Sequence, residues 1–304
     1  MLTIGTRGSP LARAQTKWVE EKILERFPDA RITVRIIKTS ADKDTKTPIR
    51  SASATGVFVR EIEEALLASD IDLAVHSMKD LPTRIPDALA IGAIPAREDA
   101  RDALIAGSSC RRLEDLPPGA VIGTGSVRRQ AQLRALRPDL AVKDIRGNVE
   151  TRLQKLAERN YDAIILACAG LNRLGLQDRI SVYFDYREML PAPGQGALAL
   201  QIRQGDERAA AMIAGLNEPA TAAAVFAERA FLRRMGGGCN SPIAVHARSL
   251  NGMCTIEGLV ATPDGTAVIR DSAECSLATA NEAAEALAER LLSMGGAEIL
   301  QSLR

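Results

Sequence analysis

Three segments of the chain place arginine where an expected strand gives way to a helix. They are Thr6–Ser9, Gly123–Arg129 and Asp144–Asn148, the last followed by Arg152 inside the next helix. Glycines at such a junction let backbone N–H groups approach an anion, and the helix N-terminus also favours negative charge. Arginine adds a planar fork of donors that suits carboxylates and phosphates. Three such junctions in one chain therefore favour a polyanionic ligand, and a polycarboxylate above all.

The junction Gly123–Arg129 reads GTGSVRR. It is an incomplete dinucleotide fingerprint, because Arg128 stands at the position of the final glycine. Two arginines in a first helical turn oppose the helix dipole, which indicates that they meet an anion. An ordinary tight turn with solvated arginines is the alternative that the sequence leaves open.

A carboxylate follows another expected strand, in the segment Ala74–Pro82. In extended backbone Lys79 and Asp80 point to opposite faces, so Asp80 could enter a cleft as an acid or base. An aspartate that closes a turn before proline is the commoner case. The two histidines, His76 and His246, are expected to be packed strand residues. Because they are far apart and lack a carboxylate cluster, we expect no metal site.

Cys239 follows three glycines and is expected on an exposed loop, where it could be a nucleophile or an attachment point. A free thiol without a role is the simpler interpretation of that residue alone. The five cysteines are widely spaced and form no CxxC pair, which favours neither disulfides nor zinc and indicates a reducing cytoplasm.

The composition excludes several classes of function. The 304 residues carry 39 Lys plus Arg against 38 Asp plus Glu, so the net charge is +1, and aromatic residues make up 3%. A general nucleic-acid binder would show a strong basic excess and stacking aromatics. The first residues, Met1–Arg7, lack the apolar core expected of a secretion signal, and no apolar stretch approaches the ~18–20 residues of a membrane span. We therefore expect neither a nucleic-acid nor a membrane partner.

The elements that must position these residues alternate between strand and helix, which predicts α/β units with a mainly parallel sheet. The expected strands are 2–5, 31–38, 71–76, 120–123, 141–145, 162–168 and 197–202. The expected helices between them are 10–27, 57–68, 127–136 and 149–159, the first with Ser9 as its N-cap and Pro10 at its first position. The pattern restarts after Asp99, so two α/β units are expected, with Leu190–Gly196 as a crossing between them. The polar segment Thr39–Thr55 is expected to be a long loop.

The last third of the chain changes character. An alanine-rich helical region at 206–235 precedes three strand-like segments, at 243–247, 255–260 and 267–269, and a final helix at 279–293. Consecutive strands with flanking helices predict a small α+β domain.

Together, seven ordered segments of this chain resemble the porphobilinogen deaminase family, also called the hydroxymethylbilane synthases. The segments are Thr6–Ala12, Asp72–Pro82, Gly123–Gln130, Ile145–Leu153, Tyr161–Gly175, Pro193–Leu198 and Gly236–Ile243. The resemblance implies an enzyme, a transferase of haem biosynthesis, that joins four porphobilinogens head to tail and releases ammonia at each step. It also implies a dipyrromethane cofactor, fixed by a thioether to the cysteine that matches Cys239.

The resemblance also implies roles for individual residues. Asp80 matches the catalytic aspartate, which stabilises a cationic intermediate and shuttles protons; nearby arginines favour its ionised form and hence the stabilising role. The cofactor-binding residues that it implies are Cys239, Asp80, Lys79, Thr124, Ser126, Arg128 and Arg129. The substrate-binding residues that it implies are Arg7, Ser9, Arg146, Arg152 and Gln195, the last in a hinge segment.

The family fold implies two periplasmic-binding-protein-like, doubly wound α/β domains and a third, smaller α+β domain. The expected boundaries are 1–96 with 197–215, then 97–196, then 216–304, and the chain is expected to be monomeric. A departure from the family lies in Arg50–Thr55, which lacks the usual lysines and glycine pair. We expect this loop still to cover the cleft, with Arg50 or Lys46 as substitutes.

Two other functions stay open on the residues alone. A non-catalytic, two-lobed carboxylate-binding protein would explain the arginines and the hinge, but it gives Cys239 no role. A nicotinamide-dependent oxidoreductase is weaker still, because the glycine fingerprint is incomplete.

Overall fold

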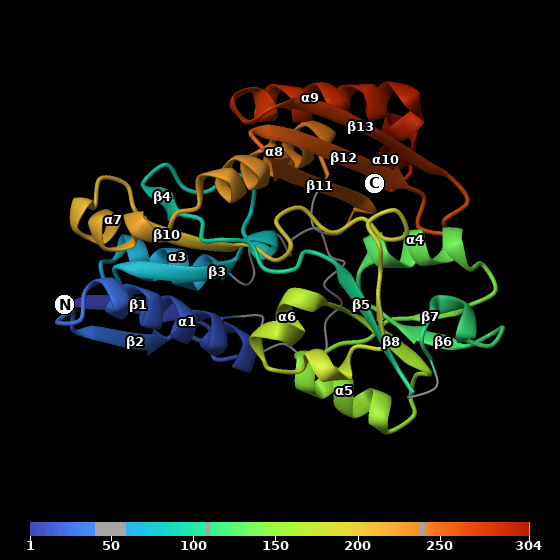
Figure 1. Ribbon diagram of the computed structural model, residues 1–304, viewed down its shortest axis with the longest axis horizontal. Coiled ribbons are helices and arrows are strands. Elements are labelled where there is room, and N and C mark those ends of the chain that lie inside the picture. Colours follow the sequence, from blue (N-terminus) through green and yellow to red (C-terminus); the bar gives the residue numbers. More distant parts are fainter. Residues whose placement is uncertain (40–58, 108–109, 238–240, 304) are drawn as a thin grey trace. The chain divides into compact units, whose positions relative to one another are not determined.

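The computed structural model describes residues 1–39, 59–107, 110–237 and 241–303 of the chain (Figure 1). These residues form two compact units. Unit 1 comprises Met1–Glu98 and Ala197–Ala222, and unit 2 comprises Asp99–Gly196 and Ala223–Arg304. The finer division into three domains, with the third starting at residue 216, stays a prediction.

Unit 1 is built on one five-stranded sheet in the order β2-β1-β3-β10-β4. Its strands are β1 (Leu2–Thr6), β2 (Ile32–Ile36), β3 (Leu73–Ser77), β4 (Leu89–Ala93) and β10 (Leu198–Arg203). Its helices are α1 (Pro10–Arg26), α3 (Arg60–Leu67), the 3-10 turn η1 (Met78–Asp80), α7 (Glu207–Ile213) and the 3-10 turn η4 (Ala214–Leu216).

The sheet of unit 1 is mixed. Strand β1 pairs in parallel with β2 and β3, whereas β10 runs antiparallel to both of its neighbours, β3 and β4. Four of the five strands therefore run in one direction, as the sequence predicted, and β10 alone runs against them. Strand β10 follows β4 by about a hundred residues, after the chain has passed through unit 2. It enters the sheet of unit 1 in the opposite direction to its neighbours.

Helix α1 begins where the sequence predicted. The Ser9 side chain accepts a hydrogen bond from the Ala12 N–H at 3.3 Å, and Pro10 is the first helical residue. Val19 and Ile23 of this helix pack against Leu2 and Ile4 of β1, in one buried apolar cluster. This packing fixes the start of the helix next to the end of β1.

Unit 2 contains a second five-stranded sheet, in the order β7-β6-β8-β5-β9. Its strands are β5 (Asp102–Ala106), β6 (Val121–Gly123), β7 (Ala141–Lys143), β8 (Ala163–Ala167) and β9 (Val182–Tyr183). Its helices are η2 (Leu113–Asp115), α4 (Val127–Leu136), α5 (Val149–Ala157), α6 (Cys168–Arg173) and η3 (Gln177–Arg179). This sheet is mixed too, because β5 runs antiparallel to β8 and β9.

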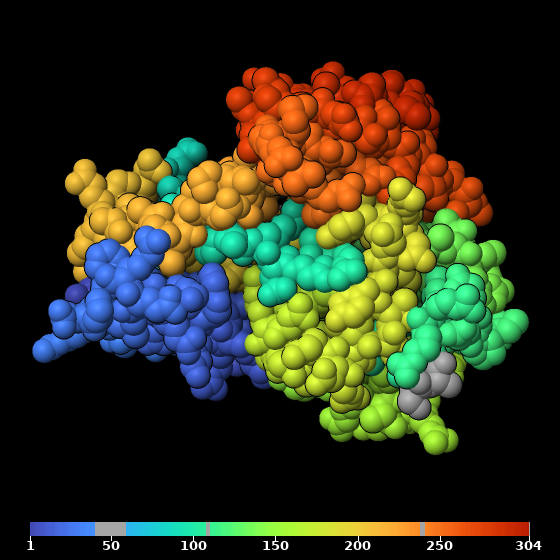
Figure 2. Space-filling model, in the orientation of Figure 1, coloured from blue at the N-terminus to red at the C-terminus, as the bar shows by residue number. Residues whose placement is uncertain are grey.

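Unit 2 also contains an antiparallel sheet, β11-β12-β13. Its elements are β11 (Ile243–Leu250), β12 (Met253–Ala261), β13 (Val268–Ser276), η5 (Leu277–Thr279), α9 (Ala280–Leu291), the π-helical turn η6 (Leu292–Gly296) and α10 (Ala297–Gln301). Helix α8 (Pro219–Met235) and α9 bury their apolar faces on this sheet in one cluster. Figure 2 shows the atoms of this C-terminal part of the chain, in orange to red, packed together.

The alanine-rich region expected as one helical stretch is broken between η4 and α8. The Glu218 carboxylate accepts hydrogen bonds from the Ala220 and Thr221 N–H groups, and Pro219 opens α8. A proline with a capping acid starts a new helix instead of continuing the old one. The predicted fold class, two α/β sheets and a smaller α+β part, is confirmed by the three sheets.

Among the described residues, no single helix has the length and apolarity needed to cross a membrane. One bent pair, Glu207–Leu216 with Pro219–Met235, passes that test only when taken together across a bend of 106°.

Candidate functional site

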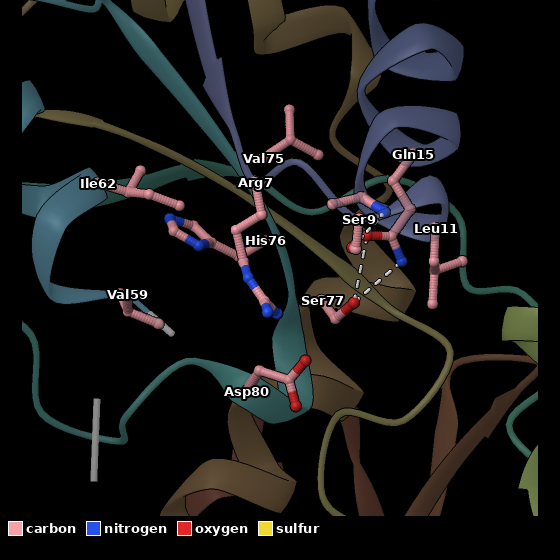
Figure 3. Close-up of a pocket in the computed structure, with 11 residues that line it drawn as sticks. Arg7, Ser9, Leu11, Gln15, Val59, Ile62, Val75, His76, Ser77 and Asp80 are labelled. Carbon is pink, nitrogen blue, oxygen red and sulfur yellow. Dashed lines mark hydrogen bonds between the residues drawn. The ribbon is translucent and has the colours of Figure 1, made fainter. Parts of the chain in front are cut away.

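A pocket in unit 1 gathers several of the predicted site residues (Figure 3). Strands β1 and β3 are parallel neighbours, so their carboxyl ends meet at one edge of the sheet, where open α/β sheets bind ligands. The pocket is lined by Arg7, Ser9, Leu11, Ala12, Gln15, Val59, Ile62, Val75, His76, Ser77 and Asp80. A cation, a carboxylate and an imidazole thus line the same cavity.

Asp80 lies at the end of the 3-10 turn η1 and is exposed at the pocket. The extended backbone predicted for Lys79 and Asp80 is wrong, because the Leu81 N–H donates to the Met78 carbonyl and closes a turn. Asp80 nevertheless enters the pocket, and in Figure 3 its carboxylate lies near the end of the Arg7 side chain. Lys79, on the same turn, is half-buried.

The opposite wall of the pocket is formed by the first turns of α1. Gln15 and Ser77 join this helix to β3 through a hydrogen bond of 2.9 Å between Nε2 and Oγ. Ser9 lines the pocket and also caps α1, so its hydroxyl has a structural task in addition to the predicted contact with substrate.

His76 lines the same pocket from β3 and is buried. Its Nε2 lies 2.9 Å from Oε1 of Gln201 on β10, and Nε2 of Gln201 donates to the Glu63 carboxylate of α3 at 2.8 Å. Burial lowers the pKa of His76 to about 4; the Gln201 bond opposes this change and the charge of Arg7 adds to it. The imidazole is therefore neutral at pH 7.

The second group of predicted residues meets in unit 2, around a carboxylate that the sequence analysis missed. Asp102, at the start of β5, has no exposed surface. Its Oδ2 accepts from Nη1 of Arg128 at 2.7 Å, and its Oδ1 accepts from Nε and Nη2 of Arg129 at 3.0 and 2.7 Å. The anion met by this pair of arginines is thus a side chain of the protein itself.

Asp102 is ionised in this cluster, because both arginines stabilise its negative charge. Burial alone would raise the pKa of Asp102, but the adjacent charges of Arg128 and Arg129 outweigh it, so the pKa lies well below the ordinary value. Burial lowers the pKa of Arg128, with the charge of Asp102 opposing that change. Two guanidinium groups and one carboxylate leave a net charge of +1 on the three side chains.

The two arginines differ in what their donors do. Arg129 uses Nε and Nη2 on Asp102 and Nη1 on the Ile165 carbonyl. Arg128 uses Nη1 on Asp102 and on the Leu190 carbonyl, while its buried Nε has no hydrogen-bond partner among the described residues. An unsatisfied buried donor is costly, and the two arginines differ in this respect.

Gln195 belongs to the same cluster, because its Nε2 donates to Asp102 Oδ1 and to the Ala100 carbonyl, both at 2.8 Å. The preceding Gly194 N–H donates to the buried Glu228 carboxylate of α8 at 2.6 Å. Glu228 also accepts from the Ala247 N–H, and His246 lies 3.3 Å from it. The predicted hinge segment is therefore held by hydrogen bonds to Asp102 and to Glu228, both of which belong to unit 2.

Thr124 and Ser126 stand at the start of α4. The Thr124 N–H donates to the Lys143 carbonyl of β7, and the Ser126 N–H donates to Thr124 Oγ1 at 3.3 Å. Ser126 occupies the N-cap position, yet its hydroxyl makes no capping hydrogen bond. A half-buried hydroxyl at a helix N-terminus that does not cap the helix suits a contact with a ligand.

Arg146 and Arg152 lie at the neighbouring junction, between β7 and α5. Because β6 and β7 are parallel and paired, this junction lies beside the one at Gly123–Arg129. Arg152 Nε donates to the Gly147 carbonyl at 2.8 Å, and Asn148 caps α5 by accepting from the Thr151 N–H. Within unit 2 the two expected anion-binding junctions are thus adjacent.

The structure thus brings Arg7, Ser9 and Asp80 together in unit 1. In unit 2 it brings together Arg128, Arg129 and Gln195, next to the junction of Arg146 and Arg152. Cys239, the predicted attachment point, lies outside the described residues, and so do Lys46, Arg50 and all of the predicted loop Thr39–Thr55 after Thr39.

Two features of the sequence could have revealed Asp102. It precedes the apolar run Ala103–Ala106, where an ionised side chain needs a buried cation. The pair Arg128 and Arg129 supplied such a cation. The sequence analysis did not pair Asp102 with Arg128, because the two residues are 26 positions apart and local periodicity does not connect them.

Comparison with known proteins identifies the family. Residues 2–211 match the family described as "Porphobilinogen deaminase, dipyromethane cofactor binding domain", and residues 222–293 match "Porphobilinogen deaminase, C-terminal domain". The chain belongs to the porphobilinogen deaminase family. The porphobilinogen deaminase of Thermus thermophilus is 48% identical over 305 residues, covering 100% of this chain and 99% of that protein.

A second member of the porphobilinogen deaminase family, from Pelobacter propionicus, is 47% identical over 302 residues, covering 99% of this chain and 97% of that protein. Among solved structures, the chain is similar to the periplasmic aliphatic sulphonate binding protein SsuA from Escherichia coli, with a TM-score of 0.40 and 20% identity over 76% of this chain and 69% of that one. Membership of the deaminase family favours an enzyme over the non-catalytic carboxylate-binding protein.

The described part of the chain contains no group of three or more His, Cys, Asp or Glu side chains that could hold a metal ion.

Proposed function

We propose that this chain is a hydroxymethylbilane synthase, which condenses four porphobilinogen molecules head to tail into the linear tetrapyrrole hydroxymethylbilane and releases ammonia at each step. The observation that carries the proposal is the family match, which extends over both the cofactor-binding domain and the C-terminal domain. The arrangement of Arg7 and Asp80 in one pocket supports it, since each porphobilinogen carries two carboxylates and reacts through a cation.

Asp80 would supply the electrostatic part of the reaction. Loss of ammonia from porphobilinogen leaves a positive charge delocalised over the pyrrole and its methylene carbon, and a fixed carboxylate stabilises such a charge as it develops. Arg7, in the same pocket, would bind a substrate carboxylate and orient the ring. After the carbon–carbon bond forms, Asp80 would remove the proton from the attacked ring position.

The residues of unit 2 suit a group with several carboxylates, as the dipyrromethane cofactor is. The cluster around Asp102 keeps a net charge of +1, and the buried Arg128 Nε is left without a partner among the described residues. We assign Arg128, Arg129, Thr124, Ser126, Lys79 and Asp80 to the cofactor, with Cys239 as its covalent anchor. When bound, the cofactor would supply the pyrrole end at which the tetrapyrrole is extended. Ser9, Arg146, Arg152 and Gln195 would bind the incoming substrate.

The decisive experiment is the intact mass of the denatured protein beside a Cys239→Ala variant. We expect a covalent excess equal to two porphobilinogens less their ammonia, and its absence from the variant. If the wild-type mass is unmodified, incubation with porphobilinogen should produce the adduct. A chain that neither carries nor acquires the adduct, and that consumes no porphobilinogen, is not a hydroxymethylbilane synthase.

The finer assignments belong to the same proposal. We expect the enzyme to act as a monomer in the cytoplasm, with porphobilinogen as its only small-molecule partner besides the cofactor. Sedimentation equilibrium over a range of concentrations tests the first point, because a constant mass equal to one chain is expected.

A further inference from the structure

The pocket of unit 1 contains a polar chain that the proposed reaction does not use. His76, Gln201 and Glu63 come from β3, β10 and α3, and they are joined by hydrogen bonds of 2.9 and 2.8 Å. Ala199 is paired with His76 and Ala74 with Gln201, so the two side chains lie diagonally on one face of the sheet. Helix α3 places Glu63 over this face.

The chain of hydrogen bonds fixes which nitrogen of His76 carries the proton. An ionised carboxylate only accepts, so Glu63 must face the NH₂ group of Gln201. The carbonyl oxygen of Gln201 then faces His76, and this oxygen also only accepts. His76 must therefore donate through Nε2–H, which leaves a lone pair on Nδ1.

The remaining nitrogen is available to a ligand. His76 has 5% of its surface exposed and lines the pocket together with Asp80 (Figure 3). Among the residues that the structure describes, Nδ1 takes no hydrogen bond. Burial and the charge of Arg7 also lower the pKa of the ring and so disfavour its protonated form. An acceptor on a residue that lines a pocket, with no partner among the described residues, can take a donor from whatever binds there.

We propose that His76 is a substrate-binding residue whose Nδ1 accepts a hydrogen bond from the aminomethyl ammonium group of porphobilinogen. This inference rests on the proposed function. The ammonium stands on the carbon at which Asp80 is proposed to stabilise positive charge, and His76 and Asp80 line the same pocket. The ammonium offers three N–H donors, whereas the pyrrole ring offers one, so the ammonium has donors for both acceptors.

The first test reads the tautomer directly. The chain has two histidines, so ¹⁵N-labelled histidine gives two ring systems, and a His76→Asn variant assigns them. We expect His76 of the holoenzyme to be neutral at pH 7, with the proton on Nε2. Addition of porphobilinogen should shift the Nδ1 resonance more than that of Nε2. A proton on Nδ1, or a larger response of Nε2, overturns the proposal.

The second test separates the two ring nitrogens by substitution. Asparagine places its amide near the position of Nδ1, and glutamine places it near Nε2. We expect His76→Gln to raise the KM for porphobilinogen about tenfold and His76→Asn to raise it about threefold or less, with a smaller change in kcat for both. Equal KM values for the two variants contradict the assignment of Nδ1.

The third test changes Glu63, at the other end of the hydrogen-bonded series, and leaves His76 unchanged. Glu63→Gln no longer fixes the amide of Gln201, so we expect a mixture of His76 tautomers and a KM about threefold higher. Glu64→Gln is the matched control, since Glu64 lies one residue further on α3, is exposed and pairs with Arg60. A Glu63→Gln enzyme with wild-type KM and a pure Nε2–H tautomer shows that Glu63 does not set the tautomer.

These outcomes are distinct from failure of the proposed function. If the wild-type chain neither holds the dipyrromethane adduct nor consumes porphobilinogen, the function itself is wrong. If it does both and His76 gives the opposing results, only the role of His76 falls.

Discussion

Arginine at a strand-to-helix junction has opposite fates in the two units. Arg7 of unit 1 lines a pocket together with an exposed carboxylate, Asp80. Arg128 and Arg129 of unit 2 are buried, and their charges are largely engaged by Asp102 from the same unit. The same sequence signal thus marks a pocket-lining cation in one place and a buried ion cluster in the other.

The difference is one of charge compensation. A cation in an open pocket can keep its charge for a ligand because water solvates it in the meantime. A buried guanidinium group requires an internal carboxylate, which then also determines how much positive charge is left for a ligand. Substitution of the carboxylate should therefore affect chemistry in unit 1 and stability in unit 2.

The largest expected effect is on turnover, at Asp80. Asp80→Asn keeps the shape of the side chain but removes the charge that would stabilise the cation, so we expect kcat to fall by roughly 10²–10⁴-fold. Steady-state assays with porphobilinogen measure this. Because Asp80 is exposed, the urea midpoint should stay that of the wild type. A large loss of stability would place Asp80 with Asp102 and remove the contrast between the units.

At Asp102 the expected effect is on folding. Asp102→Asn leaves two buried arginines without a counter-charge, and breaking a buried ion pair by removing one partner costs about 3–5 kcal/mol. Urea unfolding followed by circular dichroism measures this. A variant with wild-type stability would show that the arginines are solvated, as in the alternative that the sequence left open.

A third prediction concerns pH and His76. Its pKa is about 4 in the folded chain, whereas the ordinary pKa of a histidine side chain, which we take for the unfolded chain, is 6.5. Between these values the unfolded chain binds a proton that the folded one does not, so stability is fully present above pH 6.5 and falls as the pH drops toward 4. The difference is roughly 3 kcal/mol.

Urea unfolding of the wild type and of His76→Asn at a neutral and at a mildly acidic pH, about one unit above the folded pKa, isolates this contribution. The wild type should lose more stability than the variant on acidification. An equal loss in the two proteins would mean that His76 is not buried in the neutral form.

The smallest effect compares the two serines at helix N-termini. Ser9 caps α1, whereas the hydroxyl of Ser126 makes no capping bond in α4. We expect Ser9→Ala to cost about 1 kcal/mol of stability and Ser126→Ala to cost less than half of that. Thermal unfolding measures both. Equal costs would assign the Ser126 hydroxyl to the helix and not to a ligand.

Much of the local structure could be predicted from the sequence. The range of α4, Val127–Leu136, and the cap of α1 at Ser9 were both predicted, because capping and 3.6-residue periodicity are local properties. The direction of β10 could not be predicted in this way. It depends on which strands lie beside a segment that arrives from a distant part of the chain, and local pattern carries no such information.

Some residues of the candidate site could likewise be predicted from the sequence, and others could not. Asp80 and Arg7 belong to segments whose resemblance to the family is contiguous, so their meeting in a pocket could be anticipated. Asp102, Gln201 and Glu63 act through partners at least 26 residues away. Only packing brings such pairs together, and a buried polar residue in a strand is the one local hint of them.

The place of β10 in its sheet has a consequence for synthesis on the ribosome. Among the described strands, β4 (Leu89–Ala93) pairs only with β10 (Leu198–Arg203), so its sheet partner emerges about a hundred residues later. The sheet of β5 to β9 uses only residues between Asp102 and Tyr183 and can form first. Until β10 arrives, β3 and β4 present unpaired edges, which in nascent chains are prone to aggregation. The five-stranded sheet of unit 2 is therefore expected to be complete while the sheet of unit 1 still lacks its strand between β3 and β4.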